Sequence, residues 1–296
     1  MEKLLLAEGL GWPEGPAVLP GGRVCFVETF RSQISVWDRD GGARRYAYTA
    51  GGPNACVVGG NGELYVCQNG GTVGPWRAEE MLPPSIQRVE REGGAAEVIV
   101  TSIDGISFNG PNDLVFGPDG SLYFTDPGTY RPDNPDPSYI FALRPDGTGS
   151  LLAQLTPPTF PNGIAIDGAG DVVWAESYTG MVRRIRISDG TIEDIARLPG
   201  EHPVCDGLAI ATDGRMFVTT VNGGGIDVLN GDGSYDQFVA LASQPTNCVF
   251  DGDKLYATAA GAIADTADAS FAGQLWLVEA GTQGLQTVHG SIGGRS

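Results

Sequence analysis

The chain has 296 residues, among them 45 glycines and 20 prolines, and its 36 acidic and 18 basic side chains give a formal net charge of −18. This balance argues against binding to nucleic acid through a basic face, and it favours solubility and attraction of cations. No stretch approaches the roughly 20 apolar residues of a membrane span. The apolar run within residues 1–8 is too short for a signal peptide, so we expect a cytoplasmic protein.

The strands are predicted as a lone strand at residues 3–8 followed by six groups of four. Their expected positions are 16–20, 23–29, 33–38 and 44–48; 54–58, 63–68, 85–90 and 96–101; 112–116, 121–126, 138–143 and 150–155; 162–167, 171–176, 181–187 and 192–197; 206–210, 215–220, 225–230 and 235–241; and 246–250, 254–259, 273–279 and 284–288. Short strands separated by glycine- and proline-rich turns predict an all-β protein.

Each group opens with the same phrase: a polar turn residue after Pro or Cys, a short apolar strand, a second turn and a second strand. The aligned polar residues are Glu14, Asn54, Asn112, Asn162, Asp206 and Thr246, whose residue numbers differ by 40, 58, 50, 44 and 40. Repeats of this length with several strands each are typical of β-propellers. We therefore predict one domain, 1–296, that forms a six-bladed β-propeller with four antiparallel strands per blade. The lone first strand would pair with the last blade and seal the ring.

Three long loops separate the second and third strands of their blades, at residues 69–84, 127–137 and 260–272. By this topology, they rise on the face that carries the aligned polar residues, and insertions on one face usually mark the binding face of a repeat array. Trp76, Tyr130 and Phe271 are the aromatic side chains expected over the pocket. Each could equally pack its own loop against the blade.

The start of each innermost strand faces the central channel, so six oxygen-bearing side chains converge there, with Asn109 and Asn247 close by. Any single copy is explained by the preference of Asn and Asp for turns. Buried carboxylates without a cation are costly, however, and no basic residue or histidine occupies these positions. The pattern therefore favours one bound divalent cation, Ca²⁺, Mg²⁺ or Mn²⁺, with Zn²⁺ also open.

Other sites fit the sequence less well. Only two histidines, His202 and His289, are present, which excludes a three-histidine zinc site. The glycine pairs match no phosphate-binding loop. Glu28, Asp126 and Glu176 end second strands on the site face, either as carboxylates that support the site or as turn residues. The five cysteines form no CxxC pair, and most lie in apolar strands, as expected for small buried side chains in a reducing compartment.

Several phrases together resemble the regucalcin (senescence marker protein)/gluconolactonase/LRE-like family. They are Trp12-Pro13-Glu14-Gly15-Pro16, Pro111-Asn112-Asp113, Phe124-Thr125-Asp126-Pro127, Pro161-Asn162-Gly163-Ile164-Ala165 and Asp206-Gly207-Leu208-Ala209. The resemblance covers nearly the whole chain. It implies a divalent metal held by Glu14, Asn162 and Asp206, with Asn112 as a further ligand or as a contact for substrate or water. It also implies hydrolysis of lactones, usually sugar lactones.

Three departures from the family pattern concern the substrate wall. Cys205 stands where the family commonly has Pro, and Gln68-Asn69 stands where many bacterial members have an acid-His pair. Asn109-Gly110-Pro111 replaces a segment in which many members carry an Arg. The residues assigned to the metal are unchanged.

The leading hypothesis is a metal-dependent lactonase with Asp206 as general base or metal ligand and Asn112 as a positioning group. The candidate substrate-binding residues are Asn112, Asn109, Asn54, Asn69, Trp76 and Tyr130. The alternatives are a phosphotriester hydrolase on the same metal site and a non-catalytic propeller that binds metal or protein. The expected partner is a small lactone, without nucleic acid or membrane, and the protein is expected to be a monomer or small oligomer.

Overall fold

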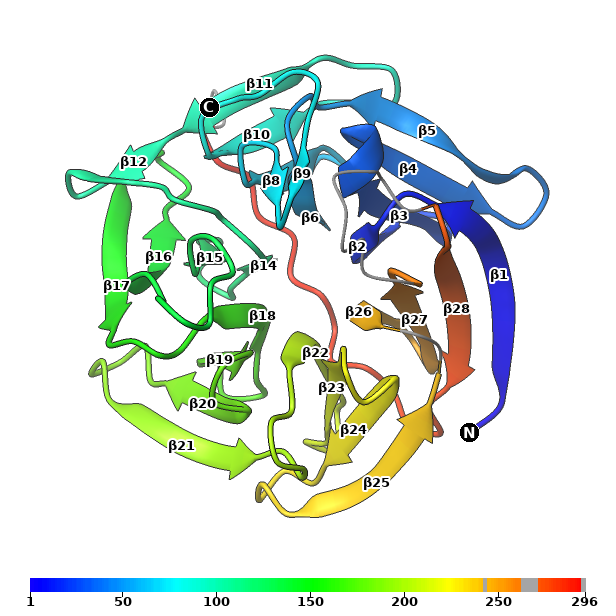
Figure 1. Cartoon of the computed structure of the whole chain (residues 1–296), viewed down its shortest axis with the longest axis vertical. Coiled ribbons are helices and arrows are strands. Elements are labelled where there is room, and N and C mark those ends of the chain that lie inside the picture. The colour runs from blue at the N-terminus through cyan, green and yellow to red at the C-terminus, as the bar shows by residue number, and fades with distance from the viewer. Residues whose placement is uncertain (242–243, 262–270, 294–296) are drawn as a thin grey trace.

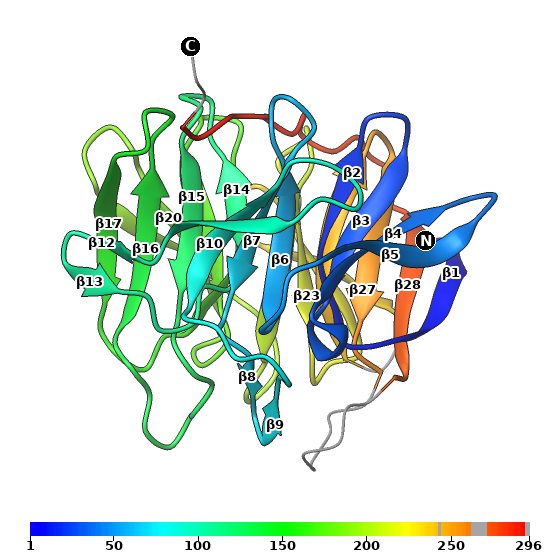
Figure 2. The ribbon, with the colours of Figure 1, turned by 90° about the horizontal axis from the view of Figure 1, so that it is seen from above.

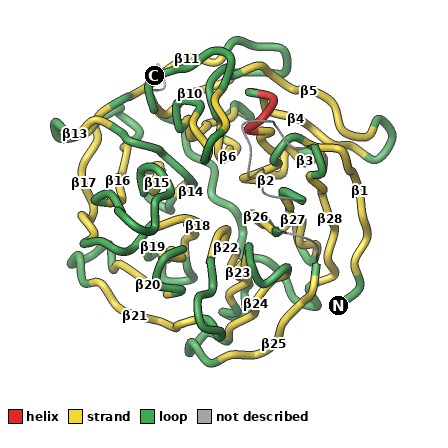
Figure 3. The backbone as a smooth tube through the Cα atoms, viewed as in Figure 1, coloured by secondary structure: helices red, strands yellow, loops and turns green. Residues whose placement is uncertain are grey.

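The computed structural model describes residues 1–241, 244–261 and 271–293. Six four-stranded antiparallel sheets are arranged around a central axis as the blades of a propeller (Figure 1). The tube in Figure 3 shows how little of the chain is helical: the described residues contain one short 3-10 turn, η1 (Thr29–Arg31). The described residues contain no helix that is long and apolar enough to cross a membrane. The predicted fold class is confirmed.

The first three blades contain the following strands. Blade one has β2 (Pro13–Leu19), β3 (Arg23–Glu28), β4 (Gln33–Asp38) and β5 (Gly42–Tyr48); blade two has β6 (Pro53–Val58), β7 (Leu64–Gln68), β10 (Ser85–Val89) and β11 (Ala96–Val100); blade three has β14 (Leu114–Phe116), β15 (Leu122–Asp126), β16 (Ser138–Leu143) and β17 (Gly149–Leu155). Two small hairpins lie outside the blades, β8 (Thr72–Val73) with β9 (Trp76–Arg77) and β12 (Ser102–Ile103) with β13 (Ile106–Ser107).

The remaining blades follow the same order from the axis outward. Blade four has β18 (Pro161–Ile166), β19 (Val172–Glu176), β20 (Met181–Ile185) and β21 (Ile192–Arg197); blade five has β22 (Cys205–Ile210), β23 (Met216–Thr220), β24 (Gly225–Leu229) and β25 (Tyr235–Ala240); blade six has β26 (Pro245–Asp251), β27 (Lys254–Ala259), β28 (Gly273–Glu279) and β1 (Lys3–Leu10). Apart from the last strand of blade six, the strands lie within three residues of their predicted bounds.

The outer strand of blade six corrects the prediction. β1 pairs antiparallel with β28, so the N-terminal strand seals the ring as expected. The predicted strand at 284–288 does not form, because β1 already occupies the edge of β28 where it would have paired. Within this stretch only Gly284 makes an isolated bridge, with Ala211 of blade five.

The segment after β28, residues 280–293, is called here the C-terminal segment. It crosses the end of the channel opposite the β8–β9 hairpin (Figures 1 and 2). Its main chain bonds to several blades: Leu285 N donates to Ile210 O at 2.9 Å, and Gly60 N donates to Gly290 O at 2.8 Å. Ile292 N donates to the Tyr65 hydroxyl at 2.8 Å. A cavity of about 470 Å³ lies between this segment and the first strands, and we call it the rear cavity.

Six side-chain hydrogen bonds link each blade to the next where the first strands begin. In each of them a hydroxyl or amide group of one blade donates to a main-chain carbonyl of the neighbour. The bonds are Thr29 Oγ1 to Pro53 O (2.7 Å), Asn54 Nδ2 to Asn112 O (3.2 Å), Thr125 Oγ1 to Asn162 O (2.9 Å), Ser177 Oγ to Cys205 O (2.6 Å), Thr219 Oγ1 to Thr246 O (2.8 Å) and Thr246 Oγ1 to Pro13 O (2.8 Å). They fix the inner strands relative to one another at the level of the site.

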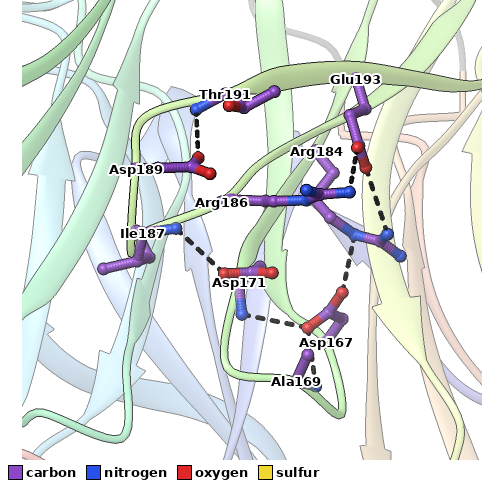
Figure 4. Close-up of polar contacts among 9 residues, drawn as sticks. All are labelled: Asp167, Ala169, Asp171, Arg184, Arg186, Ile187, Asp189, Thr191 and Glu193. Carbon is purple, nitrogen blue, oxygen red and sulfur yellow. Dashed lines mark hydrogen bonds and ion pairs between the residues drawn. The ribbon is translucent and has the colours of Figure 1, made fainter.

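Charged side chains concentrate on the outer and turn regions, as blade four illustrates (Figure 4). There Arg184 Nε lies 2.8 Å from Asp167 Oδ2, and Arg186 pairs with Glu193. These side chains are partly exposed, so each pair contributes roughly 0–1 kcal/mol to stability. We infer that this network serves the turn between β18 and β19 and has no part in the site.

Candidate metal and substrate site

Most of the predicted site residues meet in a cavity of about 400 Å³, called here the front cavity, at the end of the channel opposite the C-terminal segment. Five of the six aligned residues line it: Glu14, Asn54, Asn112, Asn162 and Asp206. The sixth, Thr246, does not; its hydroxyl donates to Pro13 O at 2.8 Å and lies 2.9 Å from the Thr258 hydroxyl. The loops at 69–84 and 127–137 contribute to the wall, while most of the loop at 260–272 lies outside the described residues.

The site residues belong to strands that are irregular at their first residues. The pairing register of the first strand shifts between Glu14 and Ala17, between Pro161 and Ile164, and between Cys205 and Leu208. Bulges of this kind re-aim side chains and are common next to active sites. These residues therefore lie in bulged strands that present them to the axis, and Glu14 also accepts a local hydrogen bond from Gly15 N at 2.9 Å.

The glycines that follow the site residues allow the inner strands to approach closely. A Cβ on Gly163 would lie 2.4 Å from the carbonyl oxygen of Asp206, and a Cβ on Gly207 would lie 2.4 Å from Cα of Asn247. Any larger residue would push neighbouring blades apart at the point where Asn162 and Asp206 must converge. This explains the Asn-Gly and Asp-Gly pairs without reference to turns.

Two carboxyl groups are buried in the front cavity, Glu14 with 4% and Asp206 with 8% of its surface exposed. Burial raises the pKa of Glu14 well above its usual value, and the charge of Asp206 raises it further. The pKa of Asp206 is also raised well above its usual value, first by burial and then by Asp113, while a hydrogen bond from Asn162 opposes the shift. The raised pKa values mean that holding both carboxylates ionised in this buried site is unfavourable. A cation between the two groups would offset this unfavourable free energy.

Asn162 supplies an oxygen suited to a cation. Its Nδ2 donates to Ser177 Oγ at 3.2 Å, while its Oδ1 is buried without a hydrogen-bond partner. No Lys, Arg or His is among the described residues that line the front cavity. Glu14, Asn162 and Asp206 therefore fit a hard divalent cation by charge and by donor type. In the described part of the chain, no three His, Cys, Asp or Glu residues are grouped to hold a metal, so a cation here would need the amide oxygen in addition to the two carboxylates.

A third buried acid, Asp113, was not among the predicted site residues. Its carboxylate accepts hydrogen bonds from Leu114 N at 2.8 Å, Asn247 Nδ2 at 3.1 Å and Ile164 N at 3.3 Å, which tie together blades three, four and six. Burial raises its pKa to about 6 against these bonds. Asp113 lines the rear cavity, so it lies beneath the site. Its position directly after Asn112 was the only signal in the sequence.

The predicted substrate-binding residues divide into two groups. Asn54, Asn69, Asn109, Asn112 and Tyr130 line the front cavity. Trp76 does not: it is 6% exposed and packs against Phe30, with 5.0 Å between ring centroids. Phe271 is likewise outside the lining, next to the Arg31 guanidinium at 5.0 Å. Trp76 therefore supports the wall from behind Phe30.

Three wall residues that sequence reasoning missed share an unusual backbone. Trp12, Phe160 and Gln244 each have a φ of 57°, in the left-handed region, and each precedes the proline that begins a first strand. Such conformations cost on the order of 1–3 kcal/mol each and often occur at functional sites. All three line the front cavity. For Trp12 and Phe160, an aromatic residue directly before Pro-Glu or Pro-Asn was the available signal; Gln244 shares only its place before a proline.

The acids that end the second strands anchor loops. Asp126 accepts hydrogen bonds from Asn109 N at 2.9 Å and Gly110 N at 2.7 Å. Glu28 accepts one from Gly11 N at 2.7 Å, and Glu176 accepts one from Thr179 Oγ1, in the loop that follows β19, at 2.6 Å. None of the three is in the front-cavity lining, so they hold the segments that carry the site.

Comparison with known proteins finds relatives along most of the chain. A family model described as the SMP-30/gluconolactonase/LRE-like region matches residues 12–261. A gluconolactonase from Zymomonas mobilis subsp. mobilis is 27% identical in an alignment that covers 84% of this chain and 76% of the relative.

Two solved structures establish the fold. A gluconolactonase from Xanthomonas campestris has a TM-score of 0.73 and 22% identity, covering 93% of this chain and 88% of that one. A calcium-binding regucalcin from Agrobacterium tumefaciens has a TM-score of 0.74 and 15% identity, covering 97% and 96%. At these identities the likeness concerns the arrangement of the blades.

Proposed function

The chain belongs to the SMP-30/gluconolactonase/LRE-like family, and we propose that it is a lactonase that hydrolyses an uncharged lactone, most simply a sugar lactone, in the front cavity. The observation that carries this proposal is the convergence of Glu14, Asp206 and the unpartnered Oδ1 of Asn162 in one cavity. The gluconolactonase relative with 27% identity supports the reaction class.

We assign Glu14, Asn162 and Asp206 as the residues that hold a divalent cation. When bound, such a cation supplies Lewis acidity for a carbonyl oxygen and stabilises the charge that develops on it. Asn112, half-buried in the wall, lies where it can contribute a further oxygen or orient the substrate.

The protein groups account for the proton transfers of ring opening. Water attacks the lactone carbonyl carbon, and we assign the Asp206 carboxylate as acceptor of the proton that this water loses. When the bond between the carbonyl carbon and the ring oxygen breaks, the same proton passes to the departing ring oxygen, which leaves a hydroxy acid. Asp206 is assigned this role because its buried carboxylate lines the front cavity, where the substrate would bind.

The wall favours neutral substrates. Its polar contributors are mainly amides, such as Asn54, Asn69 and Asn109, which donate and accept hydrogen bonds without charge. Trp12, Phe30 and Phe160 supply apolar surface. A phosphorylated or carboxylated lactone would face Glu14 and Asp206 without a basic side chain in the described wall, so we expect it to be rejected.

The test is lactone hydrolysis followed by pH-stat with chelator-treated protein and with Ca²⁺, Mn²⁺, Zn²⁺ or Mg²⁺ restored. The substrates are five- and six-membered sugar lactones, aliphatic lactones, a phosphorylated sugar lactone and one phosphotriester. We expect metal-restored turnover on neutral lactones and little on the phosphorylated one. Absence of turnover with every metal, on folded protein, would refute the lactonase assignment. Faster turnover of the phosphotriester than of any lactone would indicate a phosphotriester hydrolase instead.

A further inference from the structure

A serine that was not among the predicted site residues lies between two of the residues assigned to the cation. Ser177 directly follows β19, is 4% exposed and lines the front cavity. Its main-chain N–H donates to Phe160 O at 2.9 Å, which fixes the serine beside the start of β18. Its hydroxyl is thereby placed between Asn162 of blade four and Cys205, the neighbour of Asp206, on blade five.

The hydrogen bonds of this hydroxyl determine which group of Asn162 faces it. Ser177 Oγ lies 2.6 Å from the carbonyl oxygen of Cys205, and a carbonyl can only accept, so the hydroxyl proton is committed there. The contact between Oγ and the Asn162 side chain, at 3.2 Å, must then be donated by the Asn162 Nδ2 group.

The opposite orientation of the amide would be unfavourable. It would place Asn162 Oδ1 against Ser177 Oγ, two acceptors without a proton between them, and would leave the Nδ2 protons without this partner. The main chain of Asn162 is held separately, because Thr125 Oγ1 donates to its carbonyl at 2.9 Å. The side-chain torsion is therefore the remaining freedom of Asn162, and Ser177 restricts it.

We propose that Ser177 is a positioning residue that holds the Asn162 amide with Nδ2 turned to the protein and Oδ1 uncommitted, available to a divalent cation. The proposal rests on the proposed function in that it takes Asn162 as a ligand. Partners of ligating side chains commonly act in this way, and their loss typically lowers metal affinity by about 10- to 100-fold. Ser177 does not touch the cation or the substrate in this scheme.

The principal experiment measures Ca²⁺ and Mn²⁺ affinity by titration calorimetry on chelator-treated protein. Ser177→Ala removes both hydrogen bonds, and we expect the Kd to rise about tenfold or more. Ser177→Thr retains the hydroxyl, and we expect the Kd to return to within about threefold of the wild-type value. The conservative variant separates the hydroxyl from simple volume.

Ser32→Ala is the matched control. Ser32 is also buried, with 8% exposed, and its Oγ donates to Gly51 O at 2.6 Å in the loop that leads into blade two. This variant removes one buried serine hydrogen bond of equal length away from Asn162. We expect a similar fall in Tm but a Kd within about twofold of wild type, because no partner of a ligating side chain is lost. Equal losses of affinity in both variants would show general loosening and overturn the proposal, as would unchanged affinity in Ser177→Ala.

A second measurement does not depend on metal or on a variant at Ser177. The side-chain amide protons of Asn162, assigned by comparison with Asn162→Asp, should exchange slowly in metal-free wild-type protein, because Nδ2 donates to a buried oxygen. Rapid exchange would overturn the positioning role even where Ser177→Ala fails to fold. Wild-type protein that binds none of the metals but protects this amide would instead refute the cation while the Nδ2 hydrogen bond to Ser177 stands.

Discussion

The hydroxyl of Thr125, on blade three, donates a 2.9 Å hydrogen bond to the main-chain carbonyl of Asn162, on blade four. Both residues are buried, and the same hydroxyl accepts from Asp113 N at 3.2 Å. One threonine therefore fixes a residue assigned to the cation relative to the neighbouring blade. The bond is one of six that connect the blades around the axis at this level.

Thr125→Val should lower the free energy of unfolding by about 1–3 kcal/mol, because Asn162 O and Asp113 N lose a buried partner. Thr125→Ser keeps the hydroxyl and should recover most of this loss. Urea unfolding of the two variants and the wild type measures the difference. Equal stability of the Val and Ser variants would show that the hydrogen bond contributes nothing measurable.

Asp206→Asn should reduce kcat for lactones by about 100- to 10,000-fold, since it removes a carboxylate assigned both to the cation and to proton transfer. The fold should survive, because the substitution replaces a buried carboxylate that has a raised pKa with a neutral amide of the same shape. Initial rates and thermal unfolding are measured on the same preparation. A folded variant with wild-type turnover would remove Asp206 from the mechanism.

Alanine substitutions of Trp12 and Trp76 should have different effects, the first on substrate binding and the second on the stability of the cavity wall. Trp12 lines the front cavity, so Trp12→Ala should raise KM, with a change that depends on the lactone used. Trp76 lies behind Phe30, so Trp76→Ala should mainly destabilise, by about 3–5 kcal/mol for loss of a buried aromatic side chain. Kinetics on a panel of lactones and unfolding in urea decide between them, and a lactone-dependent KM change in Trp76→Ala alone would reverse the assignment.

Gly163→Ala should destabilise strongly, because the new Cβ would lie 2.4 Å from the Asp206 carbonyl oxygen of the next blade. Overpacking of a closely packed interior typically costs about 1–3 kcal/mol. Gly168→Ala, on the same blade, is the control, since a Cβ there meets nothing within 4 Å. The two Tm values should differ by several degrees, and equal values would mean that blades four and five can separate without cost.

Stability should fall with rising pH in a range set partly by Asp126. Burial raises its pKa to about 6 in the folded protein, against a usual value of 3.8. The folded state therefore binds this proton more tightly than the unfolded chain. The resulting stabilisation is complete below the unfolded pKa and is lost as pH rises through about 6.

Asp126→Asn removes this titration and should flatten the dependence, although it also weakens the bonds to Asn109 N and Gly110 N. Urea unfolding at about pH 5 and about pH 7, with chelator present, measures the change between the two pH values in each protein. A pH dependence as steep in the variant as in the wild type would show that Asp126 does not contribute.

What the sequence alone determined is what repeats. Period, strand pattern and turn residues recur six times, so the propeller, its strand bounds and the convergence of Glu14, Asn162 and Asp206 follow from local chemistry. The local pattern could not show which segment pairs with the outer edge of β28. Residues 284–288 have a strand-like composition, but in the closed ring β1 occupies that edge.

The tertiary structure alone decided contacts between segments far apart in the chain. Trp76 and Trp12 are both aromatic residues near the site, and only packing shows that one lines the cavity while Phe30 covers the other. The role of Ser177 depends on a carbonyl 28 residues away on another blade. Hydrogen bonds of this kind have no sequence signature, because they depend on the distance between two strands that closure of the ring brings together.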